Sequence, residues 1–289
     1  MPTFPQFQPQ TPLEYFALLV ADDANFSLLE AAISVGQDDN PTLDTQAVLH
    51  QIDTHAARLK ARVPADAGPR QRLRLLNQFF FKELGFAGNV NDYYDPANSM
   101  LATVLETRRG IPITLALLYI EFAAQVGLTA RGVSFPGHFL VKLKLSEGEV
   151  VIDPFTGQSL SRERLDELLL PYRRRQGLTG DLDVPLSVFL QAAPPRDVLA
   201  RMLRNLKEIY RSTADWQRLV AVLNRLVVLL PQAWDERRDR GLAQAELGAA
   251  EAAAVDLGAY LAHCADAPDR EAIGQRLMAL RQPGQGPLH

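Results

Sequence analysis

Apolar residues recur at helical spacing along much of the chain. In the N-terminal third, this pattern predicts a helix that starts at Thr11 and further helices at about 26–35, 42–60 and 69–84. Thr11, Pro12 and Glu14 are typical of a helix start, because a threonine hydroxyl can cap the first turn, proline needs no donor there, and an acid is favoured at the positive helix end. The N-terminal part of the chain is therefore expected to be helical.

The strongest helical pattern lies in the middle of the chain and precedes several extended runs. Pro112 suits the first turn of this helix, and Gly127 is expected to end it. One face consists of apolar residues at helical spacing, namely Leu115, Leu118, Tyr119, Phe122 and Val126. Extended runs follow at about 129–135, 138–145 and 149–153. A helix followed by antiparallel strands predicts an α+β domain with a small sheet.

The C-terminal third is helical throughout, and its pattern repeats. Apolar residues that recur at a step of about 34 residues are the pairs Leu219 and Ala253, Leu223 and Leu257, and Leu226 and Tyr260. Together with Leu206, Tyr210, Gly241 and Gly248, they fit the tetratricopeptide pattern of large, small and turn residues. These patterns divide the chain into a flexible arm over 1–11, a helix-rich α+β domain over 12–182, and an all-α repeat module over 183–289.

Composition and charge exclude several classes of function. The chain has 30 Lys and Arg against 34 Asp and Glu, so no strong positive charge is available to attract nucleic acid. A single cysteine, Cys264, excludes an internal disulfide and a multi-cysteine metal site, and the spacing of His50 and His55 misses that of a helical ligand pair. Because no apolar stretch is long enough to span a membrane, we expect a cytoplasmic protein without cofactor, metal or membrane partner. These features do not indicate an oligomeric state.

A polar loop with two tyrosines separates the N-terminal helices from the central ones. It reads GFAGNVNDYYDPAN over 85–98. Phe86, Tyr93 and Tyr94 can anchor the loop to the domain, and its Asn and Asp side chains can bind local backbone. Two interpretations stay open. The segment is either a packed structural loop or one wall of a binding cleft, in which Tyr93, Tyr94 and Asn98 would contact a ligand.

His138 and Asp153 form the most suggestive pair of polar residues. They lie 15 residues apart on either side of a predicted hairpin, and neighbouring strands are separated by about 4.8 Å. We therefore expect a hydrogen bond between the two side chains. A carboxylate that orients an imidazole is the base half of a nucleophilic triad, although both residues can equally serve to brace the hairpin. The missing nucleophile would lie at the start of the central helix, where the helix dipole lowers the pKa of a thiol.

Several long motifs resemble the transglutaminase-like superfamily, and within it the SirB-type proteins that carry tetratricopeptide repeats. The matching runs are LNQFFFKELGFAGNVNDYYDPANS (76–99), RRGIPITLALLYIEFAAQVGL (108–128), GVSFPGHFLV (132–141), DPF (153–155) and RDVLARMLRNLKEIY (196–210). The resemblance covers about 12–280. It implies a papain-like fold whose triad consists of cysteine, histidine and aspartate in that order. His138 and Asp153 match the second and third members.

The resemblance also implies that the nucleophile is missing. The triad cysteine of the superfamily falls on Pro112, which has no nucleophilic atom. Cys264 lies far downstream in the repeat module, and Thr114 is displaced by two residues, which turns its side chain about 200° around the helix. Arg108 and Arg109 adjoin this position, either as a solvated helix end or as an anion clamp.

Three functions compete. The first is a pseudoenzyme that binds a peptide or a partner protein in the former substrate cleft of the superfamily or on the helical repeats. The residues that would contact the ligand in this cleft are Tyr93, Tyr94, Asn98, Arg108 and Arg109. The second is a hydrolase, peptidase or transferase in which His138 and Asp153 act with an activated water or a nucleophile other than cysteine. The third is a purely structural subunit of an assembly. The sequence favours the binding protein, because it keeps the frame and lacks the nucleophile.

Overall fold

The computed structural model describes residues 11–178 and 184–281. Within them the chain forms two compact units, and each is described by itself. The first, which we call the sheet unit, comprises 28–36, 42–178 and 184–202, and the second, the repeat unit, comprises 11–27, 37–41 and 203–281. The predicted arm over 1–11, apart from Thr11, and the predicted boundary at 182/183 lie outside the described residues.

The sheet unit starts with the helices α2 (Leu28–Ser34), α3 (Thr45–Lys60) and α4 (Pro69–Asn77). A π-helical turn, Gln78–Glu83, continues directly from α4, so the helix predicted over 69–84 is present with its last part more widely wound. The loop that follows contains β1 (Ala87–Gly88) and leads to α5 (Leu101–Thr107), β2 (Arg109–Gly110) and α6 (Pro112–Gln125). β1 and β2 pair in parallel, with Ala87 opposite Arg109.

A four-stranded antiparallel sheet follows α6. Its strands are β3 (Thr129–Val133), β4 (Leu140–Leu145), β5 (Gly148–Asp153) and β6 (Gln158–Leu160), in the order β3-β4-β5-β6. The first three agree with the predicted extended runs. The fourth is three residues long and largely exposed, so it gives no alternating apolar signal. α7 (Arg162–Arg175) and α8 (Leu186–Phe189) come next, and α9 (Pro195–Ser212) continues from this unit into the repeat unit.

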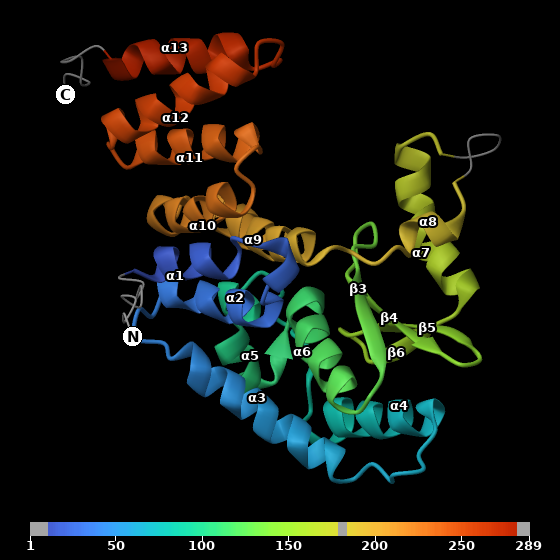
Figure 1. Cartoon of the computed structure of the whole chain (residues 1–289). Coiled ribbons are helices and arrows are strands. Elements are labelled where there is room, and N and C mark those ends of the chain that lie inside the picture. The colour runs from blue at the N-terminus through green and yellow to red at the C-terminus, as the bar shows by residue number, and fades with distance from the viewer. Residues whose placement is uncertain (1–10, 179–183, 282–289) are drawn as a thin grey trace. The chain divides into compact units, whose positions relative to one another are not determined.

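α6 is the centre of the sheet unit. It packs against β3, β4, α3, α4 and α5, and Figure 1 shows it beside β3. Residues on every side of the helix are buried, including Leu115, Tyr119 and Phe122. The ring of Phe80 lies edge-on to Tyr119 and Phe122, with centroid separations of 5.3 and 5.7 Å. A helix enclosed in this way can hold its N-terminal residues in fixed positions relative to the sheet.

The repeat unit is built from α1 (Pro12–Leu19), the end of α9, α10 (Trp216–Leu229), α11 (Trp234–Glu246), α12 (Ala250–His263) and α13 (Arg270–Arg281). α10 to α13 pack in sequence, each on the next (Figure 1). The bounds of α12 follow those of α10 at the tetratricopeptide step of about 34 residues. A Cβ on Gly241 would lie 2.9 Å from Leu257, so glycine is required for the close approach of α11 and α12.

The described residues lack two features that would indicate a function. Among the described residues, no helix combines the length and the apolarity that crossing a membrane requires. In the same part of the chain, no group of three or more His, Cys, Asp and Glu side chains is arranged to hold a metal ion.

Candidate functional site

The start of α6 is built around a buried threonine. Pro112 is the first helical residue, and Ile111 caps the helix in an extended conformation. The Thr114 hydroxyl accepts the Ile111 N–H at 3.2 Å and lies 2.8 Å from the carbonyl of Asn98, to which it donates. Thr114 is fully buried. Its hydroxyl is therefore engaged in fixing the helix start to the preceding loop, and it is not available as a replacement nucleophile.

His138 lies in the turn between β3 and β4, two residues before β4 begins at Leu140. Its backbone N–H donates to the Phe135 carbonyl at 3.0 Å, which closes the turn. The imidazole is half-buried, and its centroid lies 6.5 Å from that of the Phe135 ring. The ring is thus positioned by the backbone of its own turn.

Asp153 is the last residue of β5, and its carboxylate folds over the turn that follows. One oxygen accepts the Phe155 N–H and the other accepts the Thr156 hydroxyl, each at 2.9 Å. The expected hydrogen bond to His138 is absent from the described part of the chain, so that prediction is wrong. The reason is the register: Val141 pairs with Ile152, which places Leu140 next to Asp153 and leaves His138 beyond the end of the ladder.

The turn after β5 is held against the loop over 85–98. Gly88 in β1 donates its N–H to the Phe155 carbonyl at 2.9 Å. A Cβ on Gly88 would lie 2.3 Å from the Phe155 ring, so only glycine allows this approach without a shift. The ring of Tyr93 also contacts Phe155, at a centroid separation of 5.8 Å. The Asp153 turn is therefore held in place by contacts with a loop that is distant in sequence.

Arg201 of α9 connects the His138 turn to its surroundings, and sequence reasoning did not identify it. Its Nη1 donates to the Ser134 hydroxyl at 2.6 Å and to the Phe135 carbonyl at 3.2 Å, and its Nη2 donates to the His138 carbonyl at 2.6 Å. The guanidinium also lies 5.6 Å from the centre of the Phe139 ring. Burial lowers the pKa of Arg201, and the nearby Tyr93 opposes that change. The only available signal was its place in the RDVLARMLRNLKEIY run.

The three loop residues predicted to contact a ligand differ in their surroundings. Asn98 is buried, and its amide donates to the Asp92 carbonyl at 2.6 Å and accepts from the Asn89 amide at 3.0 Å. Burial raises the pKa of Tyr93, the neighbouring Tyr94 raises it further, and Arg201 lowers it. Tyr94 is 75% exposed. Asn98 therefore organises the loop from within, Tyr93 connects it to the Asp153 turn, and Tyr94 faces solvent.

Arg108 and Arg109 point to different partners. Arg109 donates from Nη1 to the carbonyls of Gly85 at 2.8 Å and of Arg108 at 3.0 Å. Arg108 has a left-handed backbone, with φ of 60°, and its guanidinium lies 4.8 Å from the centre of the Phe86 ring. Its Nη2 lies 3.3 Å from Nε2 of His55 on α3. The structure therefore does not form a clamp from these two neighbours.

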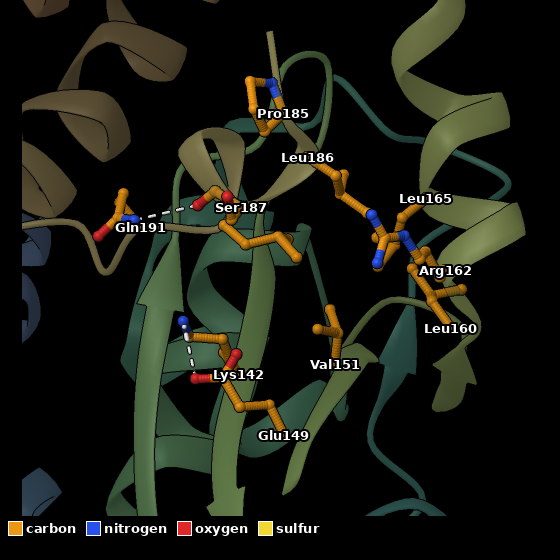
Figure 2. Close-up of a pocket in the computed structure, with 11 residues that line it drawn as sticks. Lys142, Glu149, Val151, Leu160, Arg162, Leu165, Pro185, Leu186, Ser187 and Gln191 are labelled. Carbon is orange, nitrogen blue, oxygen red and sulfur yellow. Dashed lines mark hydrogen bonds and ion pairs between the residues drawn. The ribbon is translucent and has the colours of Figure 1, made fainter.

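A pocket of about 650 Å³ lies elsewhere in the sheet unit (Figure 2). Apolar side chains of the sheet and α7, among them Val151, Leu160 and Leu165, line it together with the segment from Pro185 to Gln191. Its charged lining residues are Lys142, Glu149 and Arg162, and Lys142 pairs with Glu149 across β4 and β5 at 3.2 Å. A second cavity, of about 470 Å³, is lined mainly by α6, β3 and the residues 192–195. The sequence motifs did not indicate either cavity.

Comparison with known proteins agrees with the two-part architecture. Residues 46–204 match the transglutaminase-like superfamily, and residues 206–278 match the tetratricopeptide repeat. A UPF0162 protein of Xylella fastidiosa (strain 9a5c) is 37% identical over 248 residues, which cover 85% of this chain and 86% of the relative. A UPF0162 protein of Pseudomonas aeruginosa is 28% identical over 264 residues, with coverage of 91% and 94%.

The similarity extends to other bacteria at lower identity. A UPF0162 protein of Vibrio cholerae is 24% identical over 263 residues, which cover 91% of this chain and 95% of the relative. No solved structure gives a significant match to the chain. The predicted fold class is confirmed, since a transglutaminase-like domain precedes helical repeats. The chain therefore belongs to the SirB-type UPF0162 family, in which these two parts are joined.

Proposed function

We propose that this protein is a non-catalytic member of its family that binds a peptide or a partner protein. The observation that carries the proposal is the start of α6. By the resemblance to the superfamily, its cysteine falls on Pro112, and the hydroxyl of Thr114, two residues further along α6, is buried and hydrogen-bonded. Tetratricopeptide repeats generally mediate contacts between proteins, which supports a binding role. We place this activity in the cytoplasm as part of the same proposal.

The surface that we propose for the ligand lies beside the His138 turn. Arg201 binds this turn, Tyr93 lies near Arg201 and against Phe155, and Tyr94 is exposed on the same loop as Tyr93. Exposed tyrosines contribute large contact areas at a small cost in conformational entropy, so Tyr94 is the expected anchor for a peptide. His138 and Asp153 act here as structural remnants, because the Asp153 carboxylate binds its own turn.

The proposal is tested by selecting peptides from a display library on the full chain and measuring their affinities by fluorescence anisotropy. We expect Tyr94→Ser to weaken selected peptides by at least about tenfold, the effect of losing a contact residue at an interface. Val188→Ser is the matched control, because Val188 is 53% exposed on α8 of the same unit. This variant should bind the selected peptides with wild-type affinity. Equal affinities for wild type and Tyr94→Ser would refute the proposed surface.

A further inference from the structure

Two arginines of the sheet unit face the same histidine. Arg58 and His55 lie one turn apart on α3, and Arg108 follows the end of α5. Nη1 of Arg58 lies 3.4 Å from Nδ1 of His55, and Nη2 of Arg108 lies 3.3 Å from Nε2 of the same ring. Two guanidinium groups thus approach the two nitrogens of one imidazole.

This arrangement is unfavourable without a counter-ion. A neutral imidazole has one acceptor nitrogen and one N–H, so it can accept a hydrogen bond from only one of the two arginines. A protonated ring accepts from neither and adds a third positive charge. In agreement with this conflict, burial lowers the pKa of His55, and Arg108 and Arg58 lower it further. Burial and the two cations thus disfavour the charged form of the histidine.

Arg108 also carries a donor without a partner. Its Nη1 is buried and has no hydrogen-bond acceptor among the residues described. Buried polar atoms are nearly always satisfied, and an exception often marks the place of an ion or a water molecule. In addition, Arg108 ends α5 in a left-handed conformation with φ of 60°, which is uncommon for residues other than glycine.

The neighbouring charges do not neutralise the cluster. Arg62, in the turn that follows α3, pairs with Glu83 of the π-helical turn and lies 5.1 Å from the centre of the Phe79 ring. Arg58 lies 5.9 Å from the same ring. Across residues 11–178 and 184–281, neither Arg58 nor Arg108 is paired with a carboxylate. Glu83 is therefore engaged by Arg62 and by neither Arg58 nor Arg108.

We propose that His55, Arg58 and Arg108 form a binding site for a phosphate-type oxyanion, either inorganic phosphate or the phosphoryl group of a small molecule. Such an anion can accept from the unpartnered Nη1 of Arg108 and from Arg58, and it lets His55 become a third donor. A dianion matches this charge better than a carboxylate does, because two arginines and a protonated histidine carry three positive charges. The site is independent of the proposed peptide surface and uses none of its residues.

The test is an NMR titration of the full chain, in which the His55 ring is assigned with the variant His55→Asn. With inorganic phosphate at 10 mM, we expect the His55 pKa to rise by about one unit or more, because a nearby anion favours the charged imidazole. Sodium chloride of equal ionic strength should leave it unchanged. An equal rise in both salts, or no rise in phosphate, would overturn the site.

Variants separate binding from folding. Arg108→Gly removes the side chain, and glycine suits the left-handed backbone, so the variant should keep the fold. Its affinity for phosphate, measured by calorimetry, should fall at least tenfold. Arg109→Gln is the matched control, since Arg109 binds local carbonyls and should retain wild-type affinity. Affinity that is unchanged in both Arg108→Gly and Arg58→Gln would refute the proposal. Glycerol phosphate identifies the source: tighter binding than inorganic phosphate supports a phosphoryl ligand, and weaker binding supports the free ion.

Discussion

Replacing Arg201 by methionine is expected to open the turn that carries His138. The substitution removes three hydrogen bonds, to Ser134, Phe135 and His138, and the contact with the Phe139 ring. A hydrogen bond from a charged donor contributes about 1.5–3 kcal/mol. The Ser134 hydroxyl is exposed and regains water, so we count the two carbonyl bonds and expect a loss of about 3 kcal/mol in local stability.

Hydrogen exchange measures this loss directly. The His138 amide is bonded to the Phe135 carbonyl, so its exchange reports the opening of the turn. Arg211→Met is the matched control on the same helix, because the Arg211 side chain is 58% exposed and pairs only with Glu208 among the described partners. Such surface pairs contribute about 0–1 kcal/mol. If both variants leave the His138 amide equally protected, Arg201 does not hold the turn.

Three further perturbations test other parts of the site. Gly88→Ala places a Cβ 2.3 Å from the Phe155 ring. Overpacking of this kind should lower the free energy of unfolding, measured with urea, by about 1–3 kcal/mol. The pKa of His55 lies below its usual 6.5, so the unfolded chain binds the proton more readily. The contribution of His55 to the free energy of unfolding should therefore be complete above pH 6.5 and be lost as the pH falls through the folded-state pKa. The variant His55→Asn should not show this loss. Pro112→Cys in a Cys264→Ser background should give a thiol that alkylates rapidly at pH 6, because the N-terminus of α6 stabilises thiolate.

Each of these expectations has a clear contradicting result. Gly274→Ala is the control for Gly88→Ala, because Gly274 has open space within helix α13, and alanine there should stabilise by up to about 1 kcal/mol. Equal effects of the two changes would show that Phe155 is not tightly packed. A melting temperature that falls equally in wild type and His55→Asn below pH 6.5 would exclude His55 as the source. An introduced thiol at 112 that reacts no faster than an ordinary one would show that the N-terminus of α6 does not stabilise a thiolate at this position.

The sequence predicted well the elements whose signal is local. The repeat step from α10 to α12 and the strands β3, β4 and β5 follow from periodic apolar positions that need no knowledge of the tertiary structure. β1 and β2 escaped prediction because each has two residues, and their pairing joins Ala87 to the distant Arg109. The division into domains at 182/183 stays a prediction.

The site was predicted less well, because it depends on register and on distant partners. Spacing alone placed His138 beside Asp153, whereas the ladder of β4 and β5 ends at the pair of Val141 and Ile152, and the Asp153 carboxylate binds its own turn. Arg201 could be recognised only once α9 was seen against the β3–β4 turn. In the same way, the sequence grouped Arg108 with Arg109, and the left-handed backbone at Arg108 directs its side chain to His55 instead.

The central claim is that this family member keeps the transglutaminase-like frame and binds a peptide or a partner protein without catalysing a reaction. The most direct measurement is the hydrolysis of peptide and ester substrates by the full wild-type chain, compared with His138→Ala. Since Pro112 has no nucleophilic atom and Thr114 is buried, both proteins should match the rate in buffer alone. Turnover by the wild type that is lost in His138→Ala would contradict the account, and it would assign the histidine to an activated water instead.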